Sequence, residues 1–392
     1  MQIVLFEDHL SSSFLPLTYT RPVGDLRMGM MTMAERYARI FNTEAAHETR
    51  VPLRALFNQP SAQMQLHINA RLFPTPSLVN ELRSLKPGDA LYSADELLAR
   101  YVDTRQDMRE HRVDSAADLT RIERITDLFS MNAMAIAFDY ELMPKDTSQV
   151  QLHPSNTVIG DSSKLFVHAS AKVYATTFNT LDGPIYIDAD AEIMEGSHIR
   201  GGFYLGKHAT MKLGTKIYGA TTIGPECKVG GEISNSVFWG YSNKAHDGFV
   251  GNSIIGQWCN LGADTNTSNL KNNYSNVKIW SYTAGDYGDT GLTFCGLIMG
   301  DHSKCGINTM FNTGTVVGVN ANIFGGGFPD KHIPSFSWGG PDGWENYQPE
   351  KAFETIGKVM QRRSIQLDDE TRKLLQQIFE DTSYQRGKTV EG

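Results

Sequence analysis

The chain has 392 residues, of which 40% are hydrophobic and 20% are charged, as in ordinary globular proteins. Its formal net charge of -8 argues against a broad nucleic-acid-binding or anionic-membrane surface, and leaves room for a local basic pocket for a phosphorylated small molecule. At roughly 100–200 residues per domain, two or three domains are expected.

The four cysteines and the N-terminal segment point to a cytoplasmic protein. Cys227, Cys259, Cys295 and Cys305 form no CxxC pair, so we expect reduced thiols. The segment MQIVLFEDHL has no basic region ahead of its apolar run, so no signal peptide is expected. No apolar stretch approaches the roughly 18 residues of a membrane-spanning helix, so we expect no membrane partner.

Strand-like and helix-like segments alternate in the first part of the chain. The strand-like segments are MQIVLFED (1–8) and LHINARLF (66–73), and the helix-like ones are the stretch after Thr32, SLVNELRSL (77–85) and DLFSMNAMAIAFDYELM (127–143). Thr32 and Glu35 have the spacing of a capping box, which would begin the first helix. This order predicts a small α/β domain over residues 1–147.

Apolar residues recur every six positions in the middle of the chain. One run is Ile187, Ile193, Ile199, Leu205, Met211, Ile217, Ile223 and Val229, and a second is Met299, Cys305, Phe311, Val317 and Ile323. Such a period fits neither an α-helix, with about 3.6 residues per turn, nor an alternating strand. It is typical of a chain that turns a corner after each repeat. The period predicts a left-handed parallel β-helix of hexapeptide repeats over residues 148–335.

The period slips at 230–243 and at 267–294. The second stretch is too long for one side of a coil, and insertions in solenoids form loops on one face, so we expect a protruding loop there. Residues 336–392 read as a helical tail. Phe353, Ile356 and Met360 fit one helical face, and Asp368 can cap a second helix.

The order of an α/β domain followed by a hexapeptide β-helix resembles the bacterial bifunctional N-acetylglucosamine-1-phosphate uridyltransferase/glucosamine-1-phosphate acetyltransferases. It resembles their shorter sugar-nucleotidyltransferase-like relatives more closely. The matching residues lie in 6–37, 68–76 and 232–269. The resemblance implies a homotrimer with coenzyme A between adjacent β-helices. It also implies a sugar phosphate or a sugar nucleotide as the small-molecule partner.

The N-terminal nucleotide site departs from the family's pattern. Pro16-Leu17 matches a family element, but DHLSSS (8–13) replaces the family's glycine-rich loop, and NARLF (69–73) lacks a metal-binding aspartate. In one interpretation these positions form an altered nucleotide site, with Mg²⁺ if the domain is active. The residues proposed for that site are Ser11, Ser12, Ser13, Arg21 and Arg27. In the other interpretation the domain is a non-catalytic remnant or a sugar-nucleotide sensor.

The β-helix aligns better with the family's acyl-transfer site. His246 falls on the histidine that acts as general base, and Asn260, Ala263 and Asn269 fall on donor- and acceptor-binding positions. Lys216 falls on an arginine that clamps the sugar phosphate. Other family positions are altered, at Ser234, Phe249, Asp264 and Leu270. The other interpretation of His246 is an exposed or hydrogen-bonded histidine on a turn.

Three functions follow from these patterns. In the first, the β-helix transfers an acetyl or acyl group from an acyl-CoA such as acetyl-CoA to an amino sugar that carries a phosphate or a nucleotide, with His246 as the base and without a metal ion. Lys244, Lys271 and Lys278 would supply phosphate contacts from the insertion. In the second, the N-terminal domain makes a nucleotide sugar from a nucleoside triphosphate and a sugar 1-phosphate. In the third, the chain is a non-catalytic trimer that binds a sugar nucleotide.

Overall fold

The structure is a computed structural model that describes residues 1–145 and 151–386. The chain divides into two compact units. The first contains Met1–Arg27 and Met31–Ile125, and the second contains Met28–Met30 and the chain from Thr126 onward. The sequence predicts an α/β domain over residues 1–147. In the structure the first unit ends at Ile125, and the last helical segment of the predicted domain packs with the second unit.

A mixed six-stranded sheet forms the centre of the first unit. Its strands are, in spatial order, β4 (Ala45–Glu48), β1 (Gln2–Phe6), β5 (Met64–Asn69), β7 (Glu96–Asp103), β6 (Asp89–Ser93) and β8 (His111–Asp114). The strand β1 runs parallel to both neighbours, and β5 pairs with β7 in the antiparallel sense. Ile3, Val4 and Leu5 are buried, which explains the apolar run at the start of the sequence.

The helices α1 (Met33–Phe41) and α2 (Pro76–Ser84) complete the predicted α/β domain. The capping box before α1 is confirmed. The Thr32 side chain accepts a hydrogen bond from the Glu35 N–H at 3.1 Å, and the Glu35 carboxylate accepts one from the Thr32 N–H at 2.6 Å. These two bonds satisfy backbone donors that the first turn of a helix leaves free. Short segments complete the unit, namely β3 (Met31–Thr32) and the 3-10 turns η1 (His9–Phe14), η2 (Leu17–Tyr19), η3 (Val23–Asp25) and η4 (Val51–Leu53). The short strand β2 (Arg27–Met28) spans the boundary, since Arg27 belongs to the first unit and Met28 to the second.

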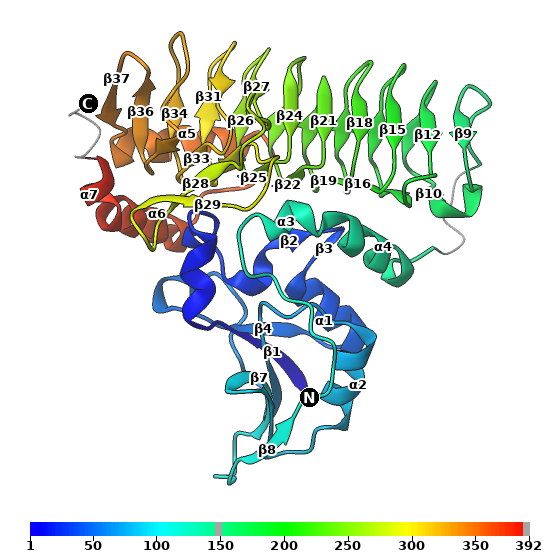
Figure 1. Ribbon diagram of the computed structural model, residues 1–392, viewed down its shortest axis with the longest axis vertical. Coiled ribbons are helices and arrows are strands. Elements are labelled where there is room, and N and C mark those ends of the chain that lie inside the picture. The colour runs from blue at the N-terminus through cyan, green and yellow to red at the C-terminus, as the bar shows by residue number, and fades with distance from the viewer. Residues whose placement is uncertain (146–150, 387–392) are drawn as a thin grey trace. The chain divides into compact units, whose positions relative to one another are not determined.

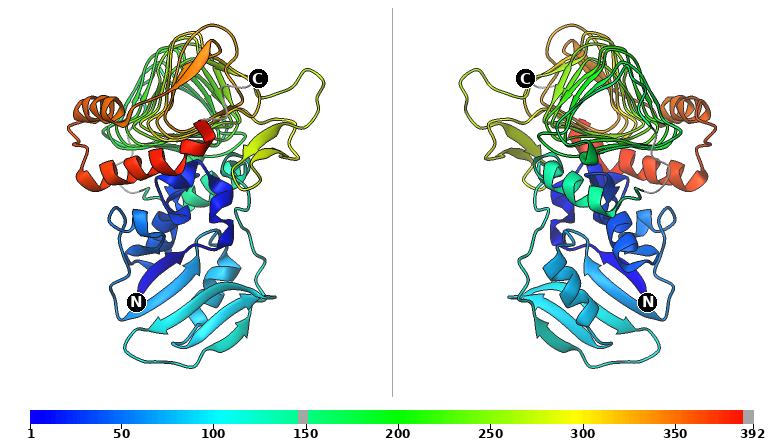
Figure 2. Two further views of the ribbon diagram at one scale, coloured as in Figure 1. Left: turned by 90° about the vertical axis from the view of Figure 1, so that its left-hand side faces the viewer. Right: turned by 90° about the vertical axis from the view of Figure 1, so that its right-hand side faces the viewer.

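The second unit is built around a parallel β-helix with three faces, seen side-on in Figure 1 and end-on as a triangle in Figure 2. The first face has the strands β10 (Leu165–Val167), β13 (Ile185–Ile187), β16 (Phe203–Leu205), β19 (Thr221–Ile223), β22 (Val237–Gly240), β25 (Ile254–Gln257), β30 (Ile298–Met299), β33 (Val316–Val317) and β35 (His332–Ile333). The second face has β11 (Lys172–Val173), β14 (Glu192–Ile193), β17 (Thr210–Met211), β20 (Lys228–Val229), β23 (Asn243–Lys244), β26 (Asn260–Leu261), β31 (Lys304–Cys305), β34 (Asn322–Ile323), β36 (Ser337–Gly340) and β37 (Gly343–Asn346).

The third face has β9 (Thr157–Ile159), β12 (Thr177–Asn179), β15 (His198–Arg200), β18 (Lys216–Tyr218), β21 (Glu232–Ser234) and β24 (Phe249–Gly251), and β27 (Asn266–Thr267) with β32 (Met310–Phe311) forms a separate pair. Ile187 pairs with Leu205, which pairs with Ile223, so a regular coil takes 18 residues, or three steps of six.

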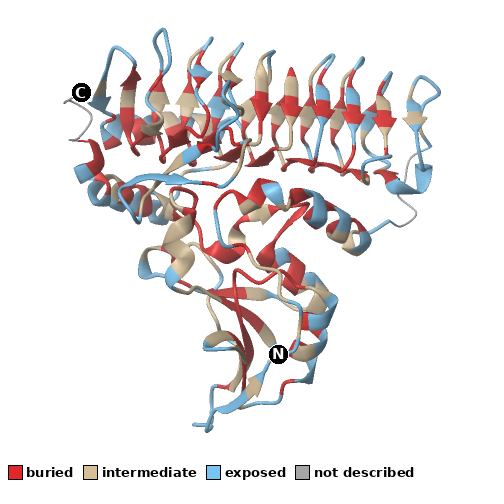
Figure 3. Cartoon of the chain, viewed as in Figure 1, coloured by how far each residue is buried: buried red, intermediate tan, exposed pale blue. Residues whose placement is uncertain are grey.

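Every residue of the two runs with a period of six is buried in the β-helix core. In Figure 3 buried residues recur in coil after coil of the β-helix. The aliphatic side chains of successive coils stack on one another, so that each coil covers the apolar surface of the next. The predicted β-helix is confirmed. The slip at 230–243 is a short coil, because Ile217 pairs with Ile233, only 16 positions later.

The insertion at 267–294 forms a loop with an antiparallel hairpin, β28 (Lys278–Ser281) and β29 (Asp286–Asp289). Figure 2 shows it projecting from the triangular coil, as expected. It lies between the third face and the first face of the next coil.

Helices pack against the β-helix within the second unit. They are α3 (Asp127–Ser130), α4 (Asn132–Leu142), α5 (Pro349–Gln361), α6 (Asp369–Asp381) and α7 (Ser383–Arg386). The predicted cap of α6 is confirmed, since the Asp368 carboxylate accepts from the Thr371 N–H at 2.7 Å. In α4, the Asn132 side chain donates to the Ala220 carbonyl at 2.9 Å, which explains why this segment packs with the second unit.

The described part of the chain contains no helix that is both long and apolar enough to cross a membrane. All four cysteines are free and buried, as predicted.

Candidate functional site

His246 lies on the tight turn that joins β23 on the second face to β24 on the third. The side chain is exposed, whereas Lys244 on β23 and Val250 on β24 are buried. The turn needs Gly248, whose φ is +114° and whose Cβ, if it had one, would lie 2.2 Å from the Thr265 carbonyl oxygen. At Gly248 the chain therefore passes close to the next coil, and the turn leaves His246 exposed at the edge of the β-helix.

Lys244 supports this turn from below. Its ammonium group donates to the carbonyl oxygens of His246, at 2.5 Å, and Asp247, at 2.9 Å. Burial lowers the pKa of Lys244 to about 8. The side chain is fully buried in β23, so the suggestion that Lys244 contacts phosphate from the insertion is wrong. Lys271 and Lys278 do lie on the insertion.

His246 opens onto a cavity of about 700 Å³ between the second face and helix α5. Asn260 and Ala263 line the same cavity, so three of the predicted site residues come together. Tyr241 and Trp258 form a stacked pair along the wall, with ring centroids 4.2 Å apart. The size falls within the roughly 300–1,000 Å³ of small-molecule sites.

Four cationic side chains line this cavity, which we call the basic cavity. They are Lys228, Lys304, Arg362 and Arg363. Burial, followed by the positive charge of Arg363, lowers the pKa of Lys228. Burial also lowers the pKa of Lys304 to about 8. Cations that repel one another at a partly buried wall favour a bound anion, because the anion relieves the repulsion.

A second hollow of about 580 Å³ lies on the other side of the His246 turn. Its lining includes Lys212, Asp247 and Asp264, and we call it the corner hollow. His246 and Ala263 line both spaces. The histidine therefore lies between the two spaces, where a group bound in the basic cavity can approach a group bound in the corner hollow.

Two further residues predicted for this site lie elsewhere. Asn269 donates to the Asn252 side-chain carbonyl at 2.8 Å, at the corner between the third and first faces. Lys216 is exposed on β18 and lines neither the basic cavity nor the corner hollow. Within a single described chain, neither residue joins His246.

Sequence reasoning missed the cations of the basic cavity. Arg362 and Arg363 follow directly on α5, which the apolar pattern marked only as a packing helix. The adjacent pair of arginines at the end of that helix was the available signal. Its meaning depends on the fold, because Arg363 reaches a coil far back in the sequence, where it donates to the Glu226 carbonyl at 3.2 Å.

The predicted nucleotide-site residues of the first unit are held by local contacts. Ser11, Ser12 and Ser13 are half-buried in the turn η1, which Asp8 caps by accepting from the Leu10 N–H at 2.9 Å. Arg21 pairs with Asp25 at 3.4 Å. Arg27 pairs with Glu35 at 3.3 Å. Each of the two arginines therefore has a structural ion-pair partner within the first unit.

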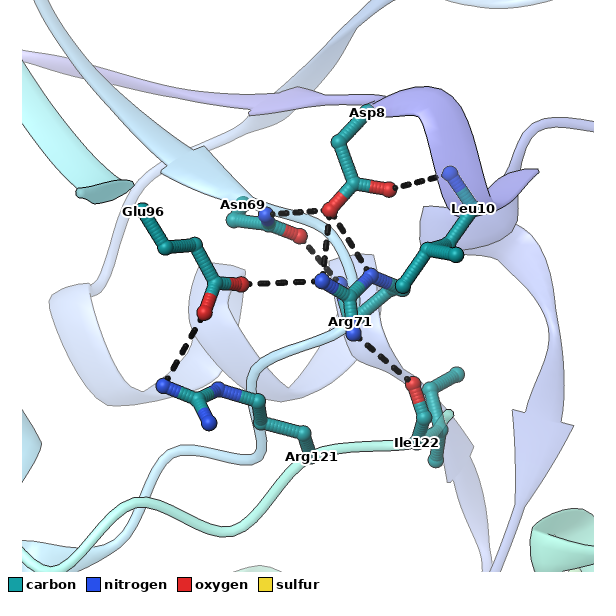
Figure 4. Close-up of polar contacts among 7 residues, drawn as sticks. All are labelled: Asp8, Leu10, Asn69, Arg71, Glu96, Arg121 and Ile122. Carbon is teal, nitrogen blue, oxygen red and sulfur yellow. Dashed lines mark hydrogen bonds and ion pairs between the residues drawn. The ribbon is translucent and has the colours of Figure 1, made fainter. Parts of the chain in front are cut away.

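Arg71, which is buried, is the centre of a partly buried polar cluster at the ends of three strands (Figure 4). Its guanidinium donates to one Asp8 oxygen through Nε at 2.8 Å and through Nη2 at 2.6 Å, and reaches Glu96 at 2.8 Å. Asn69 donates to the same Asp8 oxygen at 2.9 Å. Burial raises the pKa of Asp8, but the hydrogen bonds from Arg71 and Asn69 outweigh it and hold that pKa below its usual value.

This cluster does not suit Mg²⁺, which the family resemblance implied for an active N-terminal domain. Magnesium needs free oxygen ligands in octahedral geometry, whereas the Asp8 carboxylate already accepts bonds from Leu10, Asn69 and Arg71. Across the described ranges, no three His, Cys, Asp or Glu side chains gather as a metal site. The Arg71 guanidinium supplies the positive charge at this position.

Comparisons with known proteins agree with the two-part architecture. Residues 3–148 match the family model for sugar nucleotidyl transferases. The bifunctional sugar-1-phosphate nucleotidylyltransferase/acetyltransferase of Sulfurisphaera tokodaii is 29% identical over 155 residues, which are 39% of this chain and 38% of that protein. The bifunctional protein GlmU of Synechococcus elongatus is 22% identical over 248 residues, which are 54% of this chain and 50% of that protein.

Among solved structures, the polySia specific acetyltransferase NeuO aligns with 49% of this chain and 82% of its own, at 14% identity and a TM-score of 0.27. The matched stretches span half or less of the length of the two bifunctional relatives. The predicted resemblance is confirmed: residues 3–148 match the sugar nucleotidyl transferase family, and the chain is similar to bifunctional nucleotidylyltransferase/acetyltransferases.

Proposed function

We propose that the β-helix transfers an acyl group from acyl-CoA to the amine of a phosphate- or nucleotide-linked amino sugar. One observation carries the proposal. His246 and Ala263 line both the basic cavity and the corner hollow, so a donor and an acceptor bound in the two spaces would meet at the imidazole. The relatives named above include acetyltransferases, which supports the reaction class.

The basic cavity is the place for the donor. Coenzyme A carries a pyrophosphate and a further phosphate, and Arg362 and Arg363 offer planar donors that match such groups. The Tyr241–Trp258 stack offers an aromatic surface for the adenine ring. The acceptor then takes the corner hollow, where Lys212 can contact its phosphate and Asp264 can contact its hydroxyl groups.

The chemistry needs one base and no covalent intermediate. The amine nitrogen attacks the thioester carbonyl carbon and forms the new C–N bond, while the neutral His246 imidazole accepts the amine proton. Amide donors, including the side chain of Asn260, stabilise the oxyanion that forms on the carbonyl oxygen. The intermediate collapses with loss of the C–S bond. The imidazolium then returns the proton to the departing thiolate, giving the amide and free CoA.

The proposed assembly is a homotrimer. Asn269 and Lys216 line neither of the spaces around His246 in their own chain, and a trimer would bring other corners of the β-helix to that histidine. This follows the family resemblance, and it gives the two residues a place in a shared site.

The activity test is release of CoA thiol from acetyl-CoA. The full chain is incubated with glucosamine 1-phosphate or with a UDP-linked amino sugar, and acceptor-free reactions correct for hydrolysis. We expect acceptor-dependent thiol release and a product heavier by one acetyl group. Thiol release that does not depend on any amino sugar, or saturable acetyl-CoA binding without turnover, would contradict acyl transfer to an amine.

Nucleotidyl transfer by the first unit is the second candidate, because residues 3–148 match the sugar nucleotidyl transferase family. The bonds that occupy the Asp8 carboxylate argue against Mg²⁺ at that position. The test is pyrophosphate release from UTP and N-acetylglucosamine 1-phosphate, measured once with added Mg²⁺ and once with EDTA. Release that EDTA abolishes would establish a metal-dependent transferase and would contradict our interpretation of the Arg71 cluster.

A further inference from the structure

A third space, of about 710 Å³, lies at the C-terminal end of the β-helix. Its walls come from three parts of the second unit: the insertion hairpin β28–β29, the last strands β35 to β37, and helix α7. We call it the insertion pocket and define it by Trp280, Tyr287, His332, Trp344, Tyr384 and Gln385. None of these residues lines the basic cavity or the corner hollow.

Aromatic rings cover much of the pocket wall. Trp280 stacks on His332 with ring centroids 4.2 Å apart and planes 9° apart, and Tyr287 meets the Trp280 ring edge-on at 5.4 Å. Tyr384 stands at the rim with 62% of its surface exposed. An exposed tyrosine beside a packed tryptophan stack is a surface on which a flat apolar ligand face can lie.

Three buried polar atoms in this wall have no hydrogen-bond partner among the residues that the structure describes. They are Trp280 Nε1, His332 Nε2 and Gln385 Oε1. Gln385 is only 7% exposed, and its amide nitrogen is already used in donating to the Tyr384 hydroxyl at 2.9 Å. Most buried polar groups are paired, so three unpaired atoms behind one pocket wall are unusual, and a ligand that turns these side chains toward the pocket would pair them.

The charged residues of the pocket are already engaged. Asp330 accepts from the Trp344 indole N–H at 2.8 Å. Lys331 donates to the Lys278 carbonyl at 3.0 Å and lies over the Tyr287 ring. Burial lowers the pKa of His332 to about 4, so its imidazole is neutral at pH 7. The pocket therefore offers aromatic faces and neutral donors and acceptors in place of a free charge.

We propose that the insertion pocket binds a neutral carbohydrate. Sugar rings present a flat C–H face that packs on aromatic side chains, and their hydroxyl groups can both donate and accept. One such ring, resting on the Tyr384 ring, would accept from Trp280 Nε1 and donate to Gln385 Oε1 once these side chains turn toward the pocket. The insertion then has a function, which is to close a sugar site that is separate from His246. The proposal does not depend on acyl transfer.

The test is direct binding by the full chain. Maltose, cellobiose and diacetylchitobiose serve as neutral sugars, and uridine and inorganic phosphate serve as the comparison ligands. Binding is followed by calorimetry and by ligand-observed saturation-transfer NMR. We expect saturable binding of at least one of the three sugars. Binding of uridine or phosphate in place of the sugars, or no binding of any sugar, would overturn the proposal.

Two variants and one control locate the site. Tyr384→Ala removes an exposed ring of the pocket, and Gln385→Met removes the unpaired acceptor at nearly constant volume. We expect each to weaken sugar binding by about tenfold or more, as for the loss of a stacking contact or a buried hydrogen bond. Tyr274→Ala removes a tyrosine of the same insertion that is 71% exposed and lies outside the pocket, and should bind like the wild type. Equal weakening by all three, or by none, would place the sugar elsewhere.

Discussion

At the scale of single residues, Lys244 and His246 have different roles on the same turn. Lys244 is fully buried and its ammonium group holds two carbonyl oxygens of the turn, whereas His246 on the same turn is exposed to both spaces. A buried ammonium group is costly unless it is paired. Its presence here is explained by the turn that it supports, so Lys244 is a positioning residue.

Lys244→Met should keep the volume of the side chain and lose both bonds to the turn. Because misplacement of a base by about 1 Å can cost on the order of a hundredfold, we expect kcat for acyl transfer to fall by roughly 10- to 100-fold. The KM for acetyl-CoA should not change, since the cations of the basic cavity remain. Steady-state kinetics beside Lys172→Met, at an exposed lysine of β11, checks this. A wild-type kcat for Lys244→Met would show that the turn does not need the lysine.

At the scale of elements, Arg71 joins the ends of three strands. Asp8 follows β1, Asn69 ends β5 and Glu96 begins β7, and the one guanidinium contacts two of these directly. The sequence predicted two of these strands, β1 and β5, because apolar residues mark them, and it did not predict β7. It did not predict the cluster, because NARLF was interpreted as a metal site that had lost its aspartate. That interpretation left out the possibility that Arg71, from the same loop, supplies the positive charge that a metal ion would otherwise provide.

Arg71→Ala should leave the Asp8 and Glu96 carboxylates without their cation. Breaking a buried ion pair costs about 3–5 kcal/mol; because the Asp8 and Glu96 carboxylates are partly exposed, we expect a loss toward the lower end of that range in the free energy of unfolding of the first unit. Arg112→Ala, at the exposed pair with Asp114 on β8, should cost about 1 kcal/mol or less. Denaturant unfolding followed by circular dichroism measures both. Equal losses in the two variants would contradict a structural role for the partly buried cluster.

At the scale of the whole molecule, the β-helix was predictable and the pockets were not. A repeat has the same environment in every coil, so the period of Ile187 to Val229 directly reports the coil length. A pocket is built from segments that the sequence places far apart. The basic cavity joins Lys228 to Arg363, and the insertion pocket joins Trp280 to Gln385. Such juxtapositions depend on the packing of the C-terminal helices, which the period does not encode.

The proposed trimer is also a property of the whole molecule. Sedimentation equilibrium of the full chain should give a mass three times that of the 43.6 kDa chain. If the site is shared, Lys216→Ala should lower acyl transfer although this lysine lines neither space around His246 in its own chain. A monomer with full acyl-transfer activity would contradict the shared site.

The measurement that most directly tests the central claim is acetyl-CoA-dependent acyl transfer by His246→Ala beside His198→Ala, an exposed histidine of β15. Removal of a general base costs about 10²–10⁴-fold, so acceptor-dependent CoA release by His246→Ala should fall by at least about a hundredfold. Its binding of CoA should be kept, because the cations of the basic cavity are intact, and His198→Ala should match the wild type. Full acyl transfer by His246→Ala would contradict the account.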